Sequence, residues 1–127
     1  MERKITIDGK EFNFKASAAT PKRYRDKFHR DMLQDIAKLM IAFTKDENGE
    51  PDVDLEEFDM EILENIAYIM AKQGDYDRVP DKVEDWLDEF SGPLSLLIAS
   101  GDIMDLWASG TETLVEPKKK VNQQTDQ

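Results

Sequence analysis

The sequence predicts a mainly α-helical protein in which an N-terminal β-hairpin packs on a bundle of about four helices. Apolar and polar residues alternate over residues 4–15, as in strands, and apolar residues recur every three or four positions through much of residues 21–109, as in helices. Polar residues dominate from 110 to 127. The 127 residues therefore fit a single domain, residues 1–109, followed by a disordered tail, residues 110–127.

Residues 4–15 are expected to form the hairpin. Asp8 and Gly9 separate the two alternating runs, and an Asp-Gly pair is a strong signal for a two-residue turn. The four apolar side chains that share one face are Ile5, Ile7, Phe12 and Phe14. Because a lone hairpin is marginally stable in water, we expect this face to pack on the helices.

One long helix is expected from Pro21 to about Thr44. Thr20 is its expected N-cap, and Pro21 suits the first helical position, where the missing N–H costs nothing. The expected buried stripe comprises Tyr24, Phe28, Met32, Ile36, Met40 and Phe43. The polar residues 45–54 then predict a connector.

The next helix is expected to begin between Asp54 and Asp59 and to end near Gly74, which suits the left-handed position that follows a helix. Apolar residues cover most of its surface, so it needs neighbours on more than one side. The residues expected along its solvated edge are Glu61, Glu64, Asn65 and Tyr68.

A third helix is expected to begin at Pro80 and Asp81, with Glu84 placed three residues on, and to end before Ser91-Gly92-Pro93. Its apolar face is assigned to the core, and the residues on that face are Val83, Trp86, Leu87 and Phe90.

The last helix is expected over residues 94–107, and Ser100 and Gly101 allow an interruption. Its apolar positions do not fall on one narrow face, so we expect some of them to stay exposed as an interface. With two basic residues added, the candidate positions for partner binding or self-association are Ile103, Leu106, Trp107, Arg23 and Arg30.

The net charge of -11 is unevenly distributed. Residues 1–45 carry 11 basic and 6 acidic side chains, whereas residues 46–116 carry 3 and 21. Such an acidic body disfavours nucleic acid and anionic membranes as partners. The basic residues favour a solvated helix face over a contact with an anion: Lys22, Arg23, Arg25, Lys27 and Arg30. A second possibility is head-to-tail attraction between copies of the chain, through the positive N-terminal part and the acidic body.

No catalytic, cofactor or metal site can be assembled from the sequence, so we expect a protein that is not an enzyme. The chain has no cysteine and one histidine, His29, and its glycines are scattered singly. The acidic run beginning at Asp46 resembles a calcium loop with Glu57 at its twelfth position, but Pro51 occupies the sixth, where glycine is needed. An ordinary acidic loop is therefore favoured.

Four segments resemble the tail assembly chaperones of long-tailed bacteriophages, in the group found in phages of Gram-positive hosts. They are ITIDGKEFNFKA, ATPKRYRDKFHRDM, LENIAYIMAKQ and WLDEF, in this order along the chain. The resemblance implies a protein that binds the long, mostly helical tape measure protein, keeps it soluble and self-associates. It also implies location in the host cell cytoplasm and absence from the mature virion.

In that family a translational frameshift often produces a longer second form. Lys118, Lys119 and Lys120 require consecutive AAA or AAG codons, so we hypothesise that they mark such a frameshift; the alternative is a basic tail. The second functional hypothesis is a structural tail or connector component that stays in the virion. The third is an acidic mimic of nucleic acid, and the broad apolar helix faces argue against it.

Overall fold

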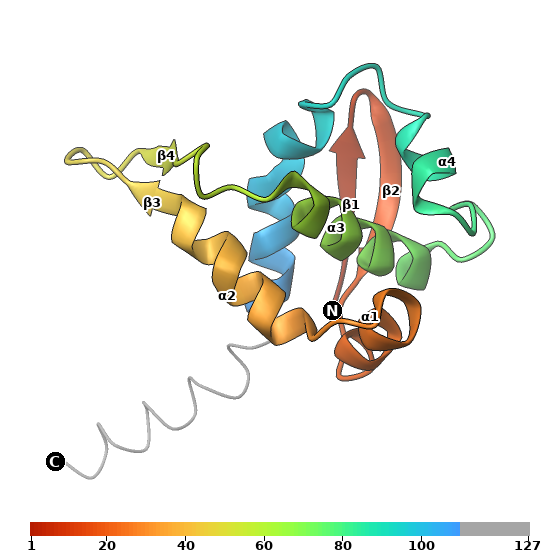
Figure 1. Ribbon diagram of the computed structural model, residues 1–127. Helices are drawn as coiled ribbons and strands as arrows, with labels where there is room; N and C mark the ends of the chain where they lie inside the picture. Colours follow the sequence, from red (N-terminus) through yellow and green to blue (C-terminus); the bar gives the residue numbers. More distant parts are fainter. Residues whose placement is uncertain (110–127) are drawn as a thin grey trace, which may run out of the picture.

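The computed structural model describes residues 1–109, apart from the side chains of Lys45 and Pro51, and the segment expected to form a disordered tail lies outside the described residues. The fold is mainly helical, with an N-terminal hairpin (Figure 1), so the predicted class is confirmed. In chain order its elements are β1 (Glu2–Ile7), β2 (Lys10–Lys15), α1 (Thr20–Phe28), α2 (Met32–Ala42), β3 (Phe43–Lys45), β4 (Pro51–Val53), α3 (Met60–Gly74), α4 (Val83–Leu87) and a C-terminal helix at residues 95–109.

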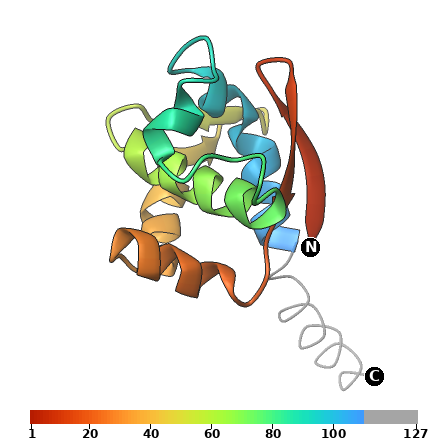
Figure 2. The ribbon, with the colours of Figure 1, turned by 90° about the vertical axis from the view of Figure 1, so that its right-hand side faces the viewer.

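β1 and β2 form an antiparallel pair in which Ile5 faces Phe12. Asp8 and Gly9 both have positive φ, 55° and 79°, as the predicted two-residue turn requires. The expected apolar face is buried, since its four side chains are at most 2% exposed. Figure 2 shows the helices gathered on one side of this hairpin.

The central element is α3, which packs on β2 and also contacts α1, α2 and α4. It begins after Asp59, whose carboxylate accepts a hydrogen bond from the backbone N–H of Glu61, so the predicted start is confirmed. Its buried residues are Ile62, Leu63, Ile66, Ala67, Tyr68, Ile69, Met70 and Ala71. Burial on several sides explains why apolar residues cover so much of its surface.

The expected long helix from Pro21 to Thr44 is wrong, because the chain breaks at His29. His29 adopts φ 58°, and Asp31 then caps α2 by accepting hydrogen bonds from the N–H groups of Leu33 and Gln34. Met32 and Ile36 are buried as expected, but further steps of four residues drift around a helix that has 3.6 residues per turn. Leu39 becomes buried, while Met40, expected in the core, is 52% exposed.

Two details at helix ends also differ from the sequence-based expectation. Ala19 is the N-cap of α1, and the Thr20 hydroxyl instead accepts a hydrogen bond from the Ser17 N–H and donates one to Gln73. Gly74 is still helical, and the C-cap is Asp75. The roles of Thr20 and Gly74 therefore depend on contacts with other elements, and the local sequence pattern does not reveal those contacts.

The expected connector contains a small hairpin, β3–β4, which extends with α2 away from the N-terminal hairpin (Figure 1). The Asp46 carboxylate accepts hydrogen bonds from the backbone N–H groups of Asn48 and Glu50, so it closes the turn. These hydrogen bonds give the Asp46 carboxylate a structural role in the turn, and this role requires no bound ion.

α4 is shorter than expected: its N-cap is Lys82, which makes no side-chain capping hydrogen bond, and Phe90 lies beyond its end. Trp86 is fully buried, with ring centroids 5.6 Å from Phe12 and 5.1 Å from Phe90. These edge-to-face contacts fix the α4 segment against the hairpin. The assignment of Trp86 to the core is confirmed.

The C-terminal helix runs from residue 95 to 109 without the interruption allowed at Ser100 and Gly101. The Ser100 hydroxyl donates a hydrogen bond of 2.6 Å to the Leu97 carbonyl oxygen, so this polar side chain is satisfied within the helix. Among residues 1–109, no helix has the length and apolar character needed to cross a bilayer.

Candidate partner-binding surfaces

Two of the five candidate residues are in the core. Ile103 and Leu106 are 0% and 1% exposed, so the expectation that they face a partner is wrong in this fold. The buried residues of the C-terminal helix recur every three or four positions, so they lie on one face: Leu96, Ala99, Ser100, Ile103 and Leu106. Trp107 is half-buried against the core, and the large apolar side chain left in solvent is Ile98, at 85% exposure.

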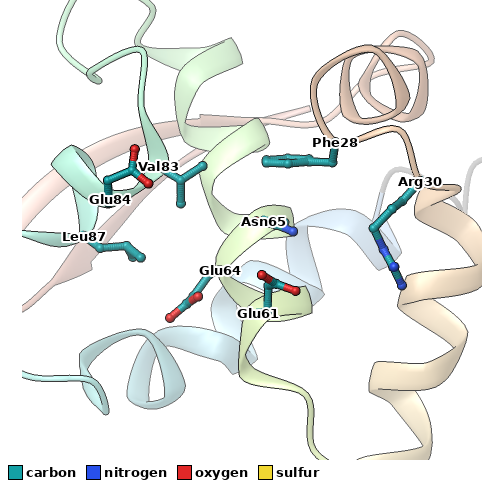
Figure 3. A pocket seen from close by; sticks show the side chains of 8 residues that line it. All are labelled: Phe28, Arg30, Glu61, Glu64, Asn65, Val83, Glu84 and Leu87. Carbon is teal, nitrogen blue, oxygen red and sulfur yellow. The ribbon is translucent and has the colours of Figure 1, made fainter.

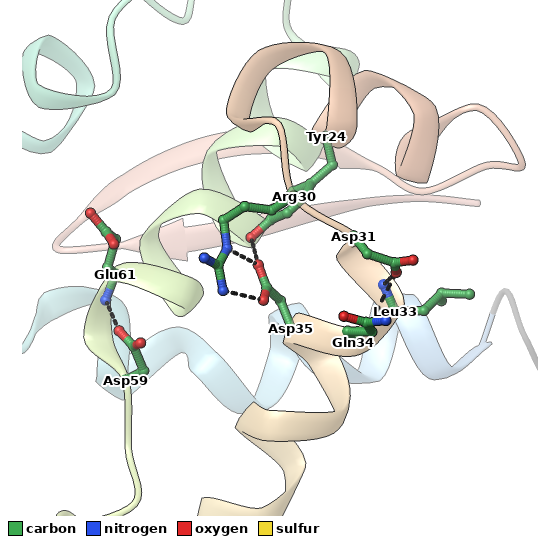
Figure 4. Close-up of polar contacts among 8 residues, drawn as sticks. All are labelled: Tyr24, Arg30, Asp31, Leu33, Gln34, Asp35, Asp59 and Glu61. Carbon is green, nitrogen blue, oxygen red and sulfur yellow. Dashed lines mark hydrogen bonds and ion pairs between the residues drawn. The ribbon is translucent and has the colours of Figure 1, made fainter.

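The basic candidates occupy different settings. Arg23 is exposed on α1 and so is accessible to a partner. Arg30, just after α1, is held by Asp35: its Nε and Nη2 atoms donate hydrogen bonds of 2.8 and 2.7 Å to the two carboxylate oxygens (Figure 4). Arg30 therefore stabilises the fold, and the Asp35 carboxylate largely neutralises its charge.

The Arg30 and Asp35 pair is completed by Tyr24, whose hydroxyl donates a hydrogen bond of 2.7 Å to Asp35. Asp35 is 2% exposed, and hydrogen bonding from the Arg30 guanidinium lowers the pKa of its carboxyl despite the opposing effect of burial. Burial, followed by the hydrogen bond to Asp35, raises the pKa of the Tyr24 hydroxyl. The network joins α1 to α2 across the break at His29.

Sequence reasoning missed an exposed apolar face on α2. Leu33, Met40 and Ile41 are 58%, 52% and 64% exposed, and their spacing of seven and eight residues places them along one side of the helix. We call these three residues the α2 stripe. A hollow of about 130 Å³ between α1 and α2, lined in part by Pro21 and Arg25, adjoins Leu33. The steps of four residues in the expected stripe placed Met40 in the core, whereas α2 buries Leu39 instead.

A second surface is a groove along α3, which we call the α3 groove (Figure 3). Its larger hollow, of about 490 Å³, is lined by Phe28, Arg30, Glu61, Glu64, Asn65, Val83, Glu84 and Leu87. Side chains of α4 stand on one side, Phe28 and Arg30 stand on the other, and α3 lies between them. Three of the four residues expected along the solvated edge of α3 line the groove, namely Glu61, Glu64 and Asn65.

The exception along that edge is Tyr68, which is 1% exposed and donates a hydrogen bond of 2.6 Å to the Pro80 carbonyl oxygen. The segment between α3 and α4 covers it. Within the groove, burial raises the pKa of the Glu64 carboxyl, and the nearby negative charges of Glu61 and Asp59 raise it further. The groove is therefore apolar in part and negatively charged.

The described residues 1–109 contain no group of three or more His, Cys, Asp or Glu side chains placed to hold a metal ion. His29 is exposed and takes part in the break between α1 and α2. None of the known protein families, curated proteins or solved structures compared with the chain matches it. Two surfaces are thus candidates for binding a partner: the apolar α2 stripe, and the α3 groove, which is apolar in part and lined by carboxylates.

Proposed function

We propose that this chain is a tail assembly chaperone of a long-tailed bacteriophage, which binds the tape measure protein, keeps it soluble and self-associates during tail assembly. The resemblance of four sequence segments supports the proposal. The structural observation that carries it is the α2 stripe, because three large apolar side chains face solvent on one side of a helix. Such a face is typical of a surface that another chain covers.

The α2 stripe suits a helical client. An amphipathic helix buries its apolar face when it packs on a second apolar face, and this removes the surface through which it would aggregate. The net charge of -11 then keeps the complex in solution by repulsion between complexes. In this proposal the chaperone acts in the host cytoplasm and leaves before the virion is complete, and a longer frameshifted form takes part in assembly.

Co-expression with the product of the next large gene tests the proposal. We expect that product to become soluble and to co-purify with this chain. A product that stays insoluble, or that is equally soluble without this chain, contradicts the proposal. Leu33→Gln, Met40→Gln and Ile41→Gln, combined in one chain, should abolish the rescue, whereas the matched changes Gln34→Lys and Lys38→Gln on the same helix should not.

A structural tail or connector component is the second candidate, and the α2 stripe favours it too, since permanent interfaces are more apolar than transient ones. Mass spectrometry of purified virions separates the two candidates. A stoichiometric amount of this chain in the particle would support the structural component, and its absence from particles that assembled in its presence would support the chaperone.

A further inference from the structure

The α3 groove is longer than its main hollow. A second hollow, of about 300 Å³, shares Glu64 and Leu87 with the first, so the two hollows lie side by side. The apolar lining of the two hollows together comes from segments far apart in the sequence: Phe28, Met60, Val83, Leu87, Phe90, Pro93 and Leu96. The groove is a product of the tertiary fold, and its apolar lining is open to apolar side chains from another chain.

The polar lining of the groove is negative. Glu61, Glu64, Glu84 and Asp88 contribute carboxylates, and no salt bridge within residues 1–109 reaches any of them. The one positively charged side chain in the lining is Arg30, and it forms a salt bridge with Asp35. Among the four acidic residues, Glu64 is partly buried and lies near enough to Glu61 for that negative charge to raise the pKa of its carboxyl.

We propose that the α3 groove binds an amphipathic basic helix of the partner, with its apolar side chains on the lining and its Lys or Arg side chains against the four carboxylates. This inference rests on the proposed function and names the chemistry of the client segment. An apolar helix with acidic flanks would bring like charges together in the groove.

The charge of the whole domain favours the same occupant. Residues 46–116, which supply most of the groove lining, carry 3 basic and 21 acidic side chains. Such a field attracts a cationic segment and raises its rate of encounter. The raised pKa of Glu64 agrees with a site in which an added positive charge is stabilising.

A fluorescent probe in the full-length chain tests the proposal. The sequence has no cysteine, so Glu84→Cys places one label at the groove while the other three carboxylates stay in place, and Glu57→Cys places one in an exposed turn before α3. The ligand is a synthetic amphipathic peptide of about 18 residues, with leucine at helical spacing and lysine elsewhere. We expect it to change the signal at position 84 and leave position 57 unchanged, and the same peptide with glutamate for lysine should not bind.

Charge variants locate the interaction. In the chain labelled at position 84, the combined changes Glu61→Gln, Glu64→Gln and Asp88→Asn should weaken peptide binding about tenfold at low salt and reduce its salt dependence. The matched changes Glu47→Gln, Asp52→Asn and Glu56→Gln alter the same net charge outside the groove and should leave the affinity unchanged. Equal weakening by both sets would overturn the proposal, because the attraction would then come from net charge alone.

Other occupants give different results, and each would overturn the inference. If the groove holds Lys118, Lys119 and Lys120 of the same chain, their replacement by glutamine changes the signal at position 84 without peptide. If it holds the basic α1 face of a second copy, the signal depends on protein concentration.

Client rescue separates failure of this inference from failure of the proposed function. If wild type and the variant with the changes at Glu61, Glu64 and Asp88 rescue the client equally, the inference fails and the proposed function stands. If wild type does not rescue the client, the proposed function itself fails.

Discussion

Gly74 lies against the backbone of Asn13, so that a Cβ atom at position 74 would stand 2.0 Å from the Asn13 carbonyl oxygen. The contact joins the end of α3 to β2, and the Asn13 side-chain amide donates a hydrogen bond of 3.0 Å to the Gly74 carbonyl oxygen. We therefore expect Gly74→Ala to lower the free energy of unfolding by about 2–3 kcal/mol, because the helix and strand must move apart. Urea denaturation measures this change.

Gly101 is the matched control for this prediction. It is also helical, but a Cβ there would meet nothing within 4 Å. Gly101→Ala should raise the free energy of unfolding by up to about 1 kcal/mol, as helix propensity alone predicts. The same sign for both substitutions would show that the close approach of Gly74 to Asn13 does not govern the packing.

Asp35→Asn should lower the free energy of unfolding by about 2–3 kcal/mol at neutral pH, since it weakens the hydrogen bonds that join Asp35 to Arg30 and Tyr24. The partial exposure of Arg30 keeps the expected cost below that of a fully buried pair. Asp26→Asn is the control, because the pair of Asp26 with Lys22 is exposed, and its effect should stay within about 0.5 kcal/mol. A comparable loss in both variants would contradict this account.

The contribution of Asp35 should also depend on pH. Its pKa in the folded state lies below the ordinary value of 3.8, because the Arg30 guanidinium stabilises the carboxylate. The stabilisation is therefore complete above about pH 4 and is lost as the pH falls through the lower folded-state pKa. Denaturation of wild type and Asp35→Asn from pH 7 to pH 2.5 should show a difference in stability that becomes smaller toward the acid end; a constant difference would argue against the pKa shift.

Glu64→Gln should stabilise the protein at neutral pH. The folded-state pKa of Glu64 is raised above 4.5 by burial and by its acidic neighbours, so the ionised side chain destabilises the fold above that pKa. The gain should vanish as the pH falls below about 4.5, where the carboxyl is protonated in both states. Thermal unfolding at several pH values measures it, and Glu47→Gln, in an exposed turn, accounts for the loss of one net charge.

The α2 stripe should separate client binding from stability. Leu33→Gln and Ile41→Gln should each change the free energy of unfolding by no more than about 0.5 kcal/mol, because their side chains are mostly in solvent. Leu39→Ala, on the buried side of the same helix, should cost about 2–5 kcal/mol. If the stripe substitutions unfold the domain, loss of the client would no longer identify a binding surface.

Features set by neighbouring residues could be predicted from the sequence. The turn at Asp8 and Gly9, the alternation on both strands and the start of α3 after Asp59 each depend on a few adjacent residues. The break at His29 was missed because helical periodicity is present on both sides of it, in α1 and in α2. The N-cap at Asp31 stabilises the separate start of α2 by only a small free energy, so the sequence pattern did not reveal it.

The candidate site was less predictable than the fold. Apolar spacing predicted that the C-terminal helix has more than one apolar side, but it gave no information on what covers each side. Ile103 and Leu106 are covered, whereas Ile98 is not. The acidic edge of α3 was expected in solvent, and its position at the base of a groove depends on Phe28 and Leu87, which are remote in the sequence.

By itself, the sequence determined the mainly helical class, the hairpin, the acidic body and the assignment of Trp86 to the core, because composition and periodicity act over short stretches of chain. Only the tertiary structure decided that Gly74 lies against Asn13, that the α2 stripe is exposed and that the α3 groove exists. The physical reason is that burial and electrostatic environment depend on contacts between distant segments, as in the pairing of Asn13 with Gly74 across 61 positions.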